Sequence, residues 1–431
     1  MRLDPYFWTI VGLSFFLRAA LLLGIGPAPQ YAFTPDSASY ILPAQQLRLT
    51  GSFATVQDGK EVPELYRTPG YPVFLIPFLS KDGLVHHRRV QWAQALLNAL
   101  SAGLIYLAAL AFWQNRTAAL AAGIGFALDF VNAIHGMFVL TDIVFVFLVS
   151  VSLLFIVRRE YVYAGVATAL AAFVRPIGLY YPGFLALLLA GQWLRKKSDP
   201  SLKHVVLFLM VSCLPLTVWM LRNQRAAGRF TFTTLQDANI YLLRAALVKM
   251  EREHVSYESA VEQLQKPLVG SPTPGTADPR ANRYLLIYWR DYVTVMAKDV
   301  VKLFTGNSMK VAAWAILKDD HYSPNAVPVH STQSPMTQAR ELTARHPLLG
   351  VGLVVYLVFL GVVYFLAAGG FAVAVRDKGW GESILALSSV LYFVAITLGV
   401  DAQARYRLPI MPALFLFAGG GYRMLFTKEN S

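Results

Sequence analysis

The sequence predicts an all-α, polytopic membrane protein, and three observations support this fold class. Hydrophobic residues make up 56% of the 431 residues and charged residues only 15%, whereas soluble proteins average about 45–50% and about 25%. The apolar residues come in blocks of roughly 20, the length that an α-helix needs to cross about 30 Å of hydrocarbon. These blocks recur from Phe7 to Leu425, which indicates a bundle of about ten transmembrane helices.

The ten apolar segments differ in how sharply their ends are marked. The first lacks a small-residue cleavage site and is followed by further spans, so we expect an uncleaved helix rather than a signal peptide. The fifth and sixth are separated only by Arg175-Pro176, where the proline ends or kinks a helix. The expected spans are 7–26, 91–112, 117–137, 141–157, 161–174, 177–194, 204–221, 347–375, 382–399 and 408–425.

The net charge of +13 fits a membrane protein whose lysines and arginines gather on one side, and we expect no nucleic-acid partner. With a cytoplasmic N-terminus, far more basic residues fall in cytoplasmic segments than in the short outer turns, which hold Arg175, Arg405 and Arg407. A cytoplasmic excess of Lys and Arg sets membrane orientation, so we expect both termini inside. The cytoplasmic basic residues are Arg2, Arg116, Arg158, Arg159, Arg195, Lys196, Lys197, Lys203, Arg376, Lys378, Arg423 and Lys428.

Two long segments then lie outside the membrane. The first outer loop, 27–90, contains an apolar stretch too short to span, and the second segment contains helical patterns over 255–266 and 283–304. We expect a multi-pass protein of the bacterial inner membrane. Its expected parts are an N-terminal transmembrane module (1–221), an extracytoplasmic loop subdomain (222–346) and C-terminal transmembrane helices (347–431).

Ionisable residues gather at the outer ends of the predicted helices although they are far apart in sequence. Asp36 follows the first span and Asp142 opens the fourth. Charged side chains near hydrocarbon are costly and usually face a cavity or one another. Arginine presents a planar fork of donors suited to phosphate oxygens, and an aspartate beside such a site can act as a general base. The arginines at this expected depth are Arg67, Arg175, Arg222, Arg405 and Arg407.

Each of these residues also has a structural interpretation. Snorkelling to lipid headgroups would explain arginines that end or precede a span, and a helix boundary would explain Arg175. Helix capping would explain Asp142, and a turn after Thr34-Pro35 would explain Asp36. The convergence of two acids and several arginines on one face favours a functional site.

Six short motifs follow one another along nearly the whole chain. They are PDSASY with Asp36, RTPGYP with Arg67, TD with Asp142, FVRP with Arg175, WMLRN with Arg222, and ARYRLPIMP with Arg405 and Arg407. In order and loop placement they resemble motifs of the lipid-linked-sugar glycosyltransferases of the GT-C superfamily. The resemblance is to the aminoarabinose transferase-like and protein O-mannosyltransferase-like families (glycosyltransferase families 39 and 83).

The resemblance implies a membrane glycosyltransferase that takes a sugar from a polyprenyl-phosphate donor. The acceptor would be a hydroxyl of a glycolipid, polysaccharide or protein on the extracytoplasmic face. Asp36 matches the catalytic acidic residue and would deprotonate the acceptor during an inverting displacement, while Asp142 would orient the acceptor or support the base. The residues implied to hold the departing lipid phosphate are Arg67, Arg175, Arg405 and Arg407.

One departure from the resemblance concerns a metal ion. Related aminoarabinose transferases place a metal-binding glutamate directly before the basic residue of the second motif, whereas this chain has Tyr66 there and Glu64 out of register. The histidines show no recognised ligand spacing. A divalent metal ion is therefore a possible cofactor without assigned ligands. The residues expected to line the cavity are Tyr66, Asp129, His135 and Arg222.

Two other classes of protein remain as alternatives. A transporter or flippase of a lipid-linked sugar would need discontinuous helices and charges near the middle of the membrane, whereas the ionisable residues here crowd one face. A non-catalytic assembly or receptor protein would leave Asp36 and Asp142 without a common cavity. Fold-level resemblance does not identify the sugar or the acceptor.

Overall fold

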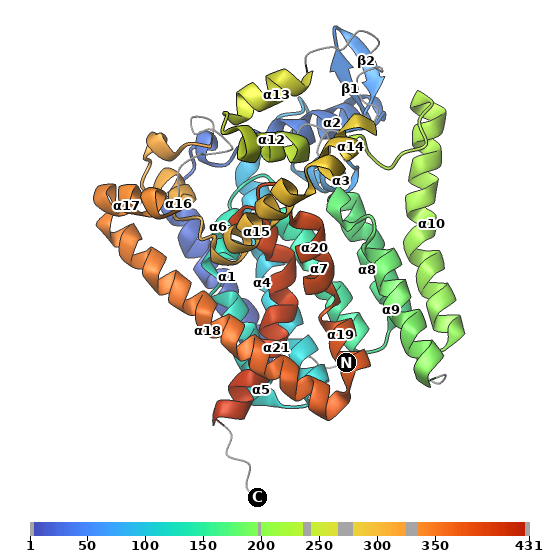
Figure 1. Ribbon diagram of the computed structural model, residues 1–431, viewed down its shortest axis with the longest axis vertical. Coiled ribbons are helices and arrows are strands. Elements are labelled where there is room, and N and C mark those ends of the chain that lie inside the picture. The colour runs from blue at the N-terminus through green and yellow to red at the C-terminus, as the bar shows by residue number, and fades with distance from the viewer. Residues whose placement is uncertain (1–3, 197–199, 236–242, 266–278, 325–334, 427–431) are drawn as a thin grey trace, which may run out of the picture.

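The computed structural model describes residues 4–196, 200–235, 243–265, 279–324 and 335–426. Within these ranges the protein is a bundle of long helices, capped at one end by shorter helices and a two-stranded hairpin (Figure 1). The hairpin consists of β1 (Ala54–Gln57) and β2 (Lys60–Pro63), which pair antiparallel with Thr55 opposite Val62. The predicted all-α membrane fold is confirmed.

Helices follow one another along the whole described chain. Those of the first half are α1 (Pro5–Ile25), α2 (Ser37–Thr50), α3 (Gly70–Leu75), α4 (His87–Trp113), α5 (Arg116–Ala127), α6 (Phe130–His135), α7 (Asp142–Val157), α8 (Tyr161–Val174), α9 (Tyr181–Lys196) and α10 (Leu202–Ala227). Those of the second half are α12 (Ala245–Glu253), α13 (Tyr257–Gln265), α14 (Pro279–Ile287), α15 (Trp289–Thr305), α16 (Met309–Ala315), α17 (Pro335–Arg345), α18 (Pro347–Lys378), α19 (Trp380–Ala386), α20 (Ser388–Thr397) and α21 (Met411–Phe426). Short 3₁₀ helices are η1 (Pro29–Tyr31), η2 (Ile76–Phe78), η3 (Pro176–Gly178), η5 (Asp320–Tyr322) and η6 (Ala404–Ile410).

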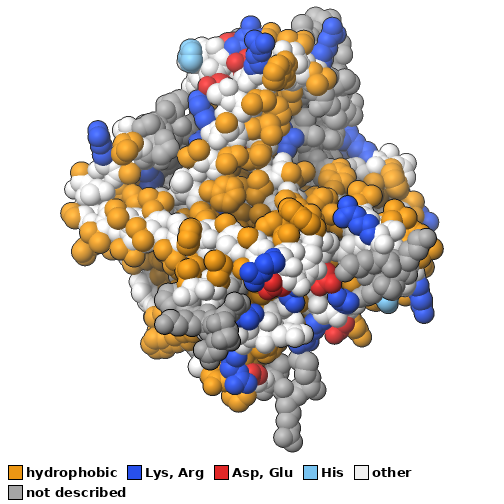
Figure 2. Space-filling view, turned by 60° about the horizontal axis from the view of Figure 1, so that its bottom comes forward, with side chains coloured by type: hydrophobic (Ala, Val, Ile, Leu, Met, Phe, Trp, Pro, Cys, Tyr) orange, Lys and Arg blue, Asp and Glu red, His pale blue; other side chains and the backbone are white. Residues whose placement is uncertain are grey.

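All ten predicted spans coincide with a helix or a broken helix, and the third is split into α5 and α6. The described residues contain six helical segments long and apolar enough to cross a membrane, and a seventh if α19 and α20, bent by 53°, form one span. Helices α7 and α8 are apolar but shorter. Hydrophobic side chains cover much of the face seen in Figure 2, in which the end of the bundle opposite the cap is turned toward the viewer. The six segments are α1, α4, Pro176–Arg195, α10, α18 and Ala404–Leu425.

The first helix begins, and the last helix ends, at the end of the bundle opposite the cap (Figure 1). Asp4, just before α1, accepts a hydrogen bond from the Tyr106 hydroxyl (2.8 Å) and pairs with Arg116 (3.7 Å) at the start of α5. Near the end of α4, the Trp113 indole donates to the carbonyl of Leu416 in α21 (2.8 Å). These contacts join α1, α4, α5 and α21.

Glycines permit the close crossing of α18 and α21. A Cβ atom at Gly370 would lie 1.8 Å from the carbonyl oxygen of Phe417, and one at Gly421 would lie 2.0 Å from that of Leu366. Small residues commonly allow membrane helices to approach in this way. The span containing α21 is accordingly the most buried of the candidate spans, with 78% of its apolar window buried.

A buried arginine of α1 fills the break between α5 and α6. Arg18 has no exposed surface, and its guanidinium donates to the carbonyls of Ala127 and, at 3.4 Å, Phe126, and to Oδ1 of Asn98 at 3.4 Å. The Phe126 carbonyl also accepts from the Asp129 N–H (3.2 Å), whereas the Ala127 carbonyl lies at the break itself, where an unpaired backbone polar group in hydrocarbon would cost several kcal/mol. Arg18 therefore stabilises a helix break inside the bundle.

Candidate active site

Asp36 lies immediately before α2 at the cap end of the bundle, and its carboxylate is held by two arginines. Arg67 donates to Oδ1 (3.0 Å), and Arg405 donates to Oδ2 from both terminal nitrogens (3.3 and 3.4 Å). The carboxylate does not cap α2. Its side chain is 42% exposed, so the ion-paired carboxylate remains open to a ligand.

The Arg67 guanidinium is oriented by residues of α2 that follow Asp36 by one helical turn. Its Nε donates to the Ser39 hydroxyl and its Nη1 to the Tyr40 hydroxyl, each at 2.8 Å. It also lies over the rings of Tyr40 (4.2 Å) and Tyr66 (4.8 Å). Because these three residues all contact one planar group, Arg67 is fixed with its remaining donor edge toward Asp36.

Glu64 shapes the loop that carries Arg67. Its Oε1 accepts hydrogen bonds from the backbone N–H groups of Tyr66 and Arg67, the latter at 2.8 Å. Two residues of the segment after α10 also bind this loop, since the Thr233 hydroxyl donates to the Tyr66 carbonyl (2.7 Å) and the Thr234 N–H donates to the Leu65 carbonyl (2.9 Å). The loop is therefore held from both sides.

Asp142 opens α7 and forms a buried ion pair with Arg175, which lies between α8 and η3. The Asp142 side chain is 1% exposed and that of Arg175 17%. Asp142 also interacts electrostatically with Arg405 and His135. Since Arg405 interacts with both Asp36 and Asp142, the two acids belong to one cluster, although 106 residues separate them in sequence.

Opposing effects set the pKa of Asp36. Burial raises the pKa of its carboxyl group, but the positive charges of Arg405 and Arg67 and their hydrogen bonds outweigh burial and hold the pKa below its usual value. Charge-assisted hydrogen bonds favour the ionised form of an acid. Asp36 is consequently a carboxylate at neutral pH.

Arg407 and Asp129 belong to a second, fully buried group. Arg407 donates to the carbonyls of Leu303 and Gly306 (2.8 Å each) and to the Tyr356 hydroxyl (3.0 Å). The same hydroxyl donates to Oδ1 of Asp129 (2.6 Å). Because these donors of Arg407 are already used and its side chain is buried, the geometry favours a role in fixing η6 rather than in holding a phosphate.

His135 and Asn132, which follow Asp129 at helical spacing in the sequence, have separate environments. His135 ends α6, and its Nε2 lies 2.9 Å from the Ser308 hydroxyl, close enough to Asp142 and Arg405 to interact with them. Asn132 pairs with Asn98 (3.0 Å) in the group around Arg18. His135 alone of the three adjoins the cluster around Asp142.

Arg222 lies near the end of α10 and connects this helix to the first outer loop. It donates to the carbonyls of Phe53 (2.7 Å) and Glu64 (3.4 Å) and to Asn223 Oδ1 (3.0 Å). Its guanidinium also lies over the Trp219 ring, at 5.0 Å from the centroid. Arg222 thus touches the loop that positions Arg67.

An open, apolar groove begins beside Arg222. Its volume is about 500 Å³, and α10 is the least buried of the candidate spans. Pro215, inside α10, contributes to its wall. The groove is thus apolar along its wall and has the Arg222 cation at its cap end. The lining residues are Phe173, Leu214, Pro215, Val218, Trp219 and Arg222.

The residues near Asp36 do not fit a divalent metal ion. Both carboxylate oxygens of Asp36 face guanidinium groups, and Glu64 Oε1 accepts two backbone hydrogen bonds. Among the described residues no three His, Cys, Asp or Glu side chains converge in a way that could hold a metal.

Comparison with known proteins gives matches among solved structures only. No protein family matches the sequence, and no curated sequence does. The apo oligosaccharyltransferase of Archaeoglobus fulgidus matches with a TM-score of 0.52 and 10% identity, over 98% of this chain and 50% of that one. The same enzyme tethered to an acceptor peptide gives 0.53 with the same identity and coverage. ArnT from Cupriavidus metallidurans bound to undecaprenyl phosphate gives 0.41 and 15%, over 95% and 78%.

The helix bundle therefore has the GT-C membrane-transferase fold, as the sequence motifs predicted, and its polar cluster lies at one end. Within that class, the chain matches the archaeal oligosaccharyltransferase over nearly all of its own length and about half the length of that enzyme.

Proposed function

We propose that this protein is a membrane glycosyltransferase that moves a sugar from a polyprenyl-phosphate donor to a hydroxyl acceptor. The observation that carries the proposal is the Asp36 carboxylate, bridged by Arg67 and Arg405 at one end of a GT-C bundle. A base and two phosphate-binding side chains are the groups that such a displacement needs. The excess of basic residues at the opposite end supports an extracytoplasmic site, and the membrane that we propose is the bacterial inner membrane.

The proposed reaction begins when the donor phosphate binds the Arg67 and Arg405 guanidiniums. These groups then leave Asp36, and the pKa of its carboxyl group rises toward its usual value, which makes it a stronger base. Asp36 takes the proton of the acceptor hydroxyl while the oxygen of that hydroxyl forms a bond to the anomeric carbon. The bond from this carbon to the phosphate oxygen breaks on the opposite side, so the configuration inverts and polyprenyl phosphate leaves. Asp142, fixed by Arg175, orients the acceptor.

A direct test uses the purified protein in lipid nanodiscs, with mass spectrometry of the lipids that co-purify. A polyprenyl-phosphate sugar among them would supply the donor for a transfer assay, in which released polyprenyl phosphate and glycosylated acceptor appear in equal amounts. A transporter of the same lipid would move it intact. Recovery of intact donor only, with transbilayer movement, would replace the proposed function by the transporter alternative.

The pH dependence of transfer follows from the lowered pKa of Asp36. We expect kcat/KM to stay level from neutral pH to about pH 5 and to fall only in more acidic solution, where the carboxylate becomes protonated. In Arg405→Gln, Arg67 alone opposes the effect of burial on the pKa of Asp36. The value of kcat/KM should therefore begin to fall at a higher pH than in the wild type. The measurement is the pH profile of kcat/KM for both proteins. A fall at the same pH in both would contradict the assignment of Asp36 as the base.

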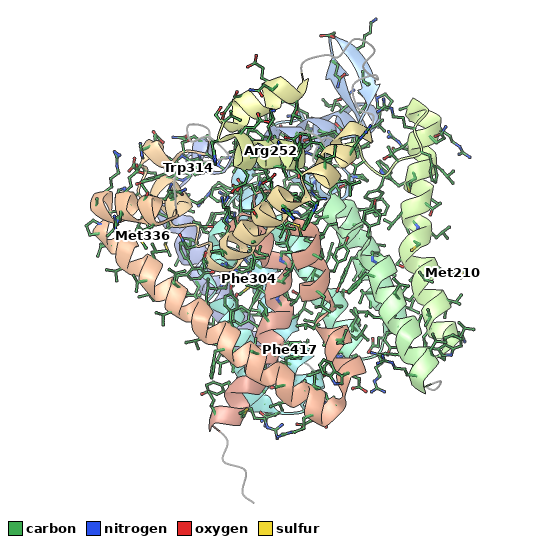
Figure 3. The ribbon with its side chains drawn as sticks, in the orientation of Figure 1. Met210, Arg252, Phe304, Trp314, Met336 and Phe417 are labelled. Atoms are coloured by element: carbon green, nitrogen blue, oxygen red, sulfur yellow. The ribbon has the colours of Figure 1, made fainter. Side chains whose placement is uncertain are left out.

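The groove beside Arg222 suits the isoprenoid chain of the donor. The groove is apolar and has a cation at one end, just as the lipid is an apolar chain with a phosphate at one end. Val218→Trp would fill it, and we expect the KM for the donor to rise about tenfold, equivalent to about 1.4 kcal/mol of lost binding, with little change in kcat. The matched control is Met210→Trp, on the same helix outside the groove (Figure 3). An equal rise in both variants would argue against the groove.

A further inference from the structure

Helix α15 has a polar anchor on its buried face and apolar side chains on its exposed face. Val295, Asp299 and Leu303 are buried at helical spacing. On the outside, Val293, Val300 and Val301 are 52%, 38% and 57% exposed, and Trp289, at the start of the helix, is 56% exposed. The exposed side also carries the polar side chains of Arg290, Thr294 and Lys298, so it combines apolar and charged groups, as helices at a membrane surface do.

The C-terminal end of α15 lies level with the middle of a candidate membrane span. Tyr364, near the midpoint of the 32-residue helix α18, donates from its hydroxyl to the Phe304 carbonyl (2.8 Å). The two rings also contact each other, with centroids 5.4 Å apart, and Figure 3 shows Phe304 among the long helices rather than in the cap. Because α18 is apolar along most of its length, this contact places the end of α15 within the thickness of the bilayer.

On its buried face, α15 holds the turn that precedes η6. The Asp299 carboxylate accepts hydrogen bonds from the backbone N–H groups of Gly399 (2.8 Å), Val400 (3.0 Å) and Ala402 (3.1 Å). Gly399 has φ +79°, and a Cβ there would lie 2.5 Å from the Tyr292 ring of α15. The backbone of the turn therefore packs directly on the helix.

Arg405 lies between two attachments to α15. Upstream, Asp299 binds the 399–402 turn; downstream, Arg407 donates to the carbonyls of Leu303 and Gly306 at the end of the same helix. The intervening backbone cannot shift without breaking one of these attachments. The position of α15 consequently determines where the Arg405 guanidinium meets Asp36.

We propose that α15 is a lipid-contacting positioning helix. Its exposed apolar face lies against the acyl chains of the surrounding bilayer, and Asp299 on the opposite face fixes the turn that places Arg405. Amphipathic helices bind the boundary between headgroups and acyl chains through such an apolar face. The positioning of Arg405 for catalysis rests on the proposed function, whereas the lipid contact and the anchoring of the turn do not.

Spin labelling tests the lipid contact. With Cys213→Ser as background, a nitroxide is attached at Val301→Cys or, as a control in the cap, at Glu258→Cys of α13. The protein is placed in nanodiscs of phosphatidylethanolamine and phosphatidylglycerol. We expect the label at 301 to collide more with oxygen, which concentrates in lipid, and the label at 258 more with a water-soluble nickel chelate. Equal access of the nickel chelate to both labels would overturn the lipid contact.

Asp299→Asn tests the positioning role, with Lys298→Gln as the control on the exposed side of α15. Asparagine has one acceptor oxygen in place of two, so amide hydrogen exchange across 399–402 should accelerate in Asp299→Asn only. Transfer should fall by up to about 10²-fold, the effect of a displacement near 1 Å, and the fall should vanish in the Arg405→Gln background. Unchanged amide hydrogen exchange across 399–402 would show that Asp299 does not anchor the turn. If the double variant lost activity by the product of the two single losses, Asp299 would act independently of Arg405. If the wild type shows no transfer, the proposed function fails, while exchange and spin-label accessibility still decide the anchoring and the lipid contact.

Discussion

Replacing Asp36 by asparagine is expected to lower sugar transfer by about 10²–10⁴-fold, the usual contribution of a general base. The amide keeps the shape of the carboxylate and can still accept a hydrogen bond from Arg67, but it cannot take up a proton from the acceptor. Because the side chain is 42% exposed, the protein should fold normally. The measurements are the initial rate of transfer, the thermal midpoint of unfolding and the affinity for the donor lipid.

The matched control for this variant is Asp58→Asn. Asp58 belongs to the same outer loop, is exposed, and lies in the hairpin turn with φ +50°, a conformation that asparagine also adopts readily. We expect this variant to retain full activity. Near-normal turnover of Asp36→Asn would remove Asp36 from its catalytic role.

Arg405→Gln is expected to lower kcat by about 10²–10³-fold, the effect of deleting one preorganised contact to a developing charge. Arg405 interacts with both Asp36 and Asp142, so it is central to the cluster, and a departing lipid phosphate would gain charge beside it. The loss should fall mainly on kcat, because this charge develops as the phosphate leaves. Steady-state kinetics with the donor varied would separate kcat from KM.

Arg48→Gln supplies the comparison for this charge removal. Arg48 is an exposed arginine of α2 that donates to the Ser80 carbonyl (3.2 Å) and lies outside the cluster. Its loss should leave both kinetic constants within a factor of about two, as expected for surface positions. A similar change in both variants would indicate a general effect of charge instead of a role in transfer.

Much of the cluster around Asp36 was predictable because topology alone brings its members to one end of the bundle. Asp36, Arg67 and Arg405 are in direct contact, and Arg405 joins them to the Asp142–Arg175 pair. Ser39 and Tyr40 were missed, although they follow Asp36 at helical spacing, because their hydroxyl groups carry no charge. The sequence analysis predicted no helix after Asp36, and α2 (Ser37–Thr50) is what brings both hydroxyl groups to Arg67.

Other members depend on contacts that no local pattern contains. Arg407 lies two residues from Arg405, yet it binds carbonyls at the end of α15 because η6 turns the two side chains toward different neighbours. Asp129 contacts Tyr356, which is 227 residues away. The break between α5 and α6 has no proline to mark it, and the arginine that stabilises it comes from the first span. Such pairings follow from tertiary packing, so the sequence predicted one continuous helix there.

Arg18 has a consequence for the order in which the protein is assembled during synthesis. Its partners Asn98 and Ala127 are translated 80 and 109 residues later. An arginine near the middle of a lone membrane helix costs about 2.5–3.5 kcal/mol by translocon insertion scales. The first helix is therefore least stable in the bilayer before any other helix has been made. It is stabilised only after the second and third hydrophobic segments have packed against it. Retention of this nascent helix by the insertion machinery until about residue 130 has emerged would bridge that interval.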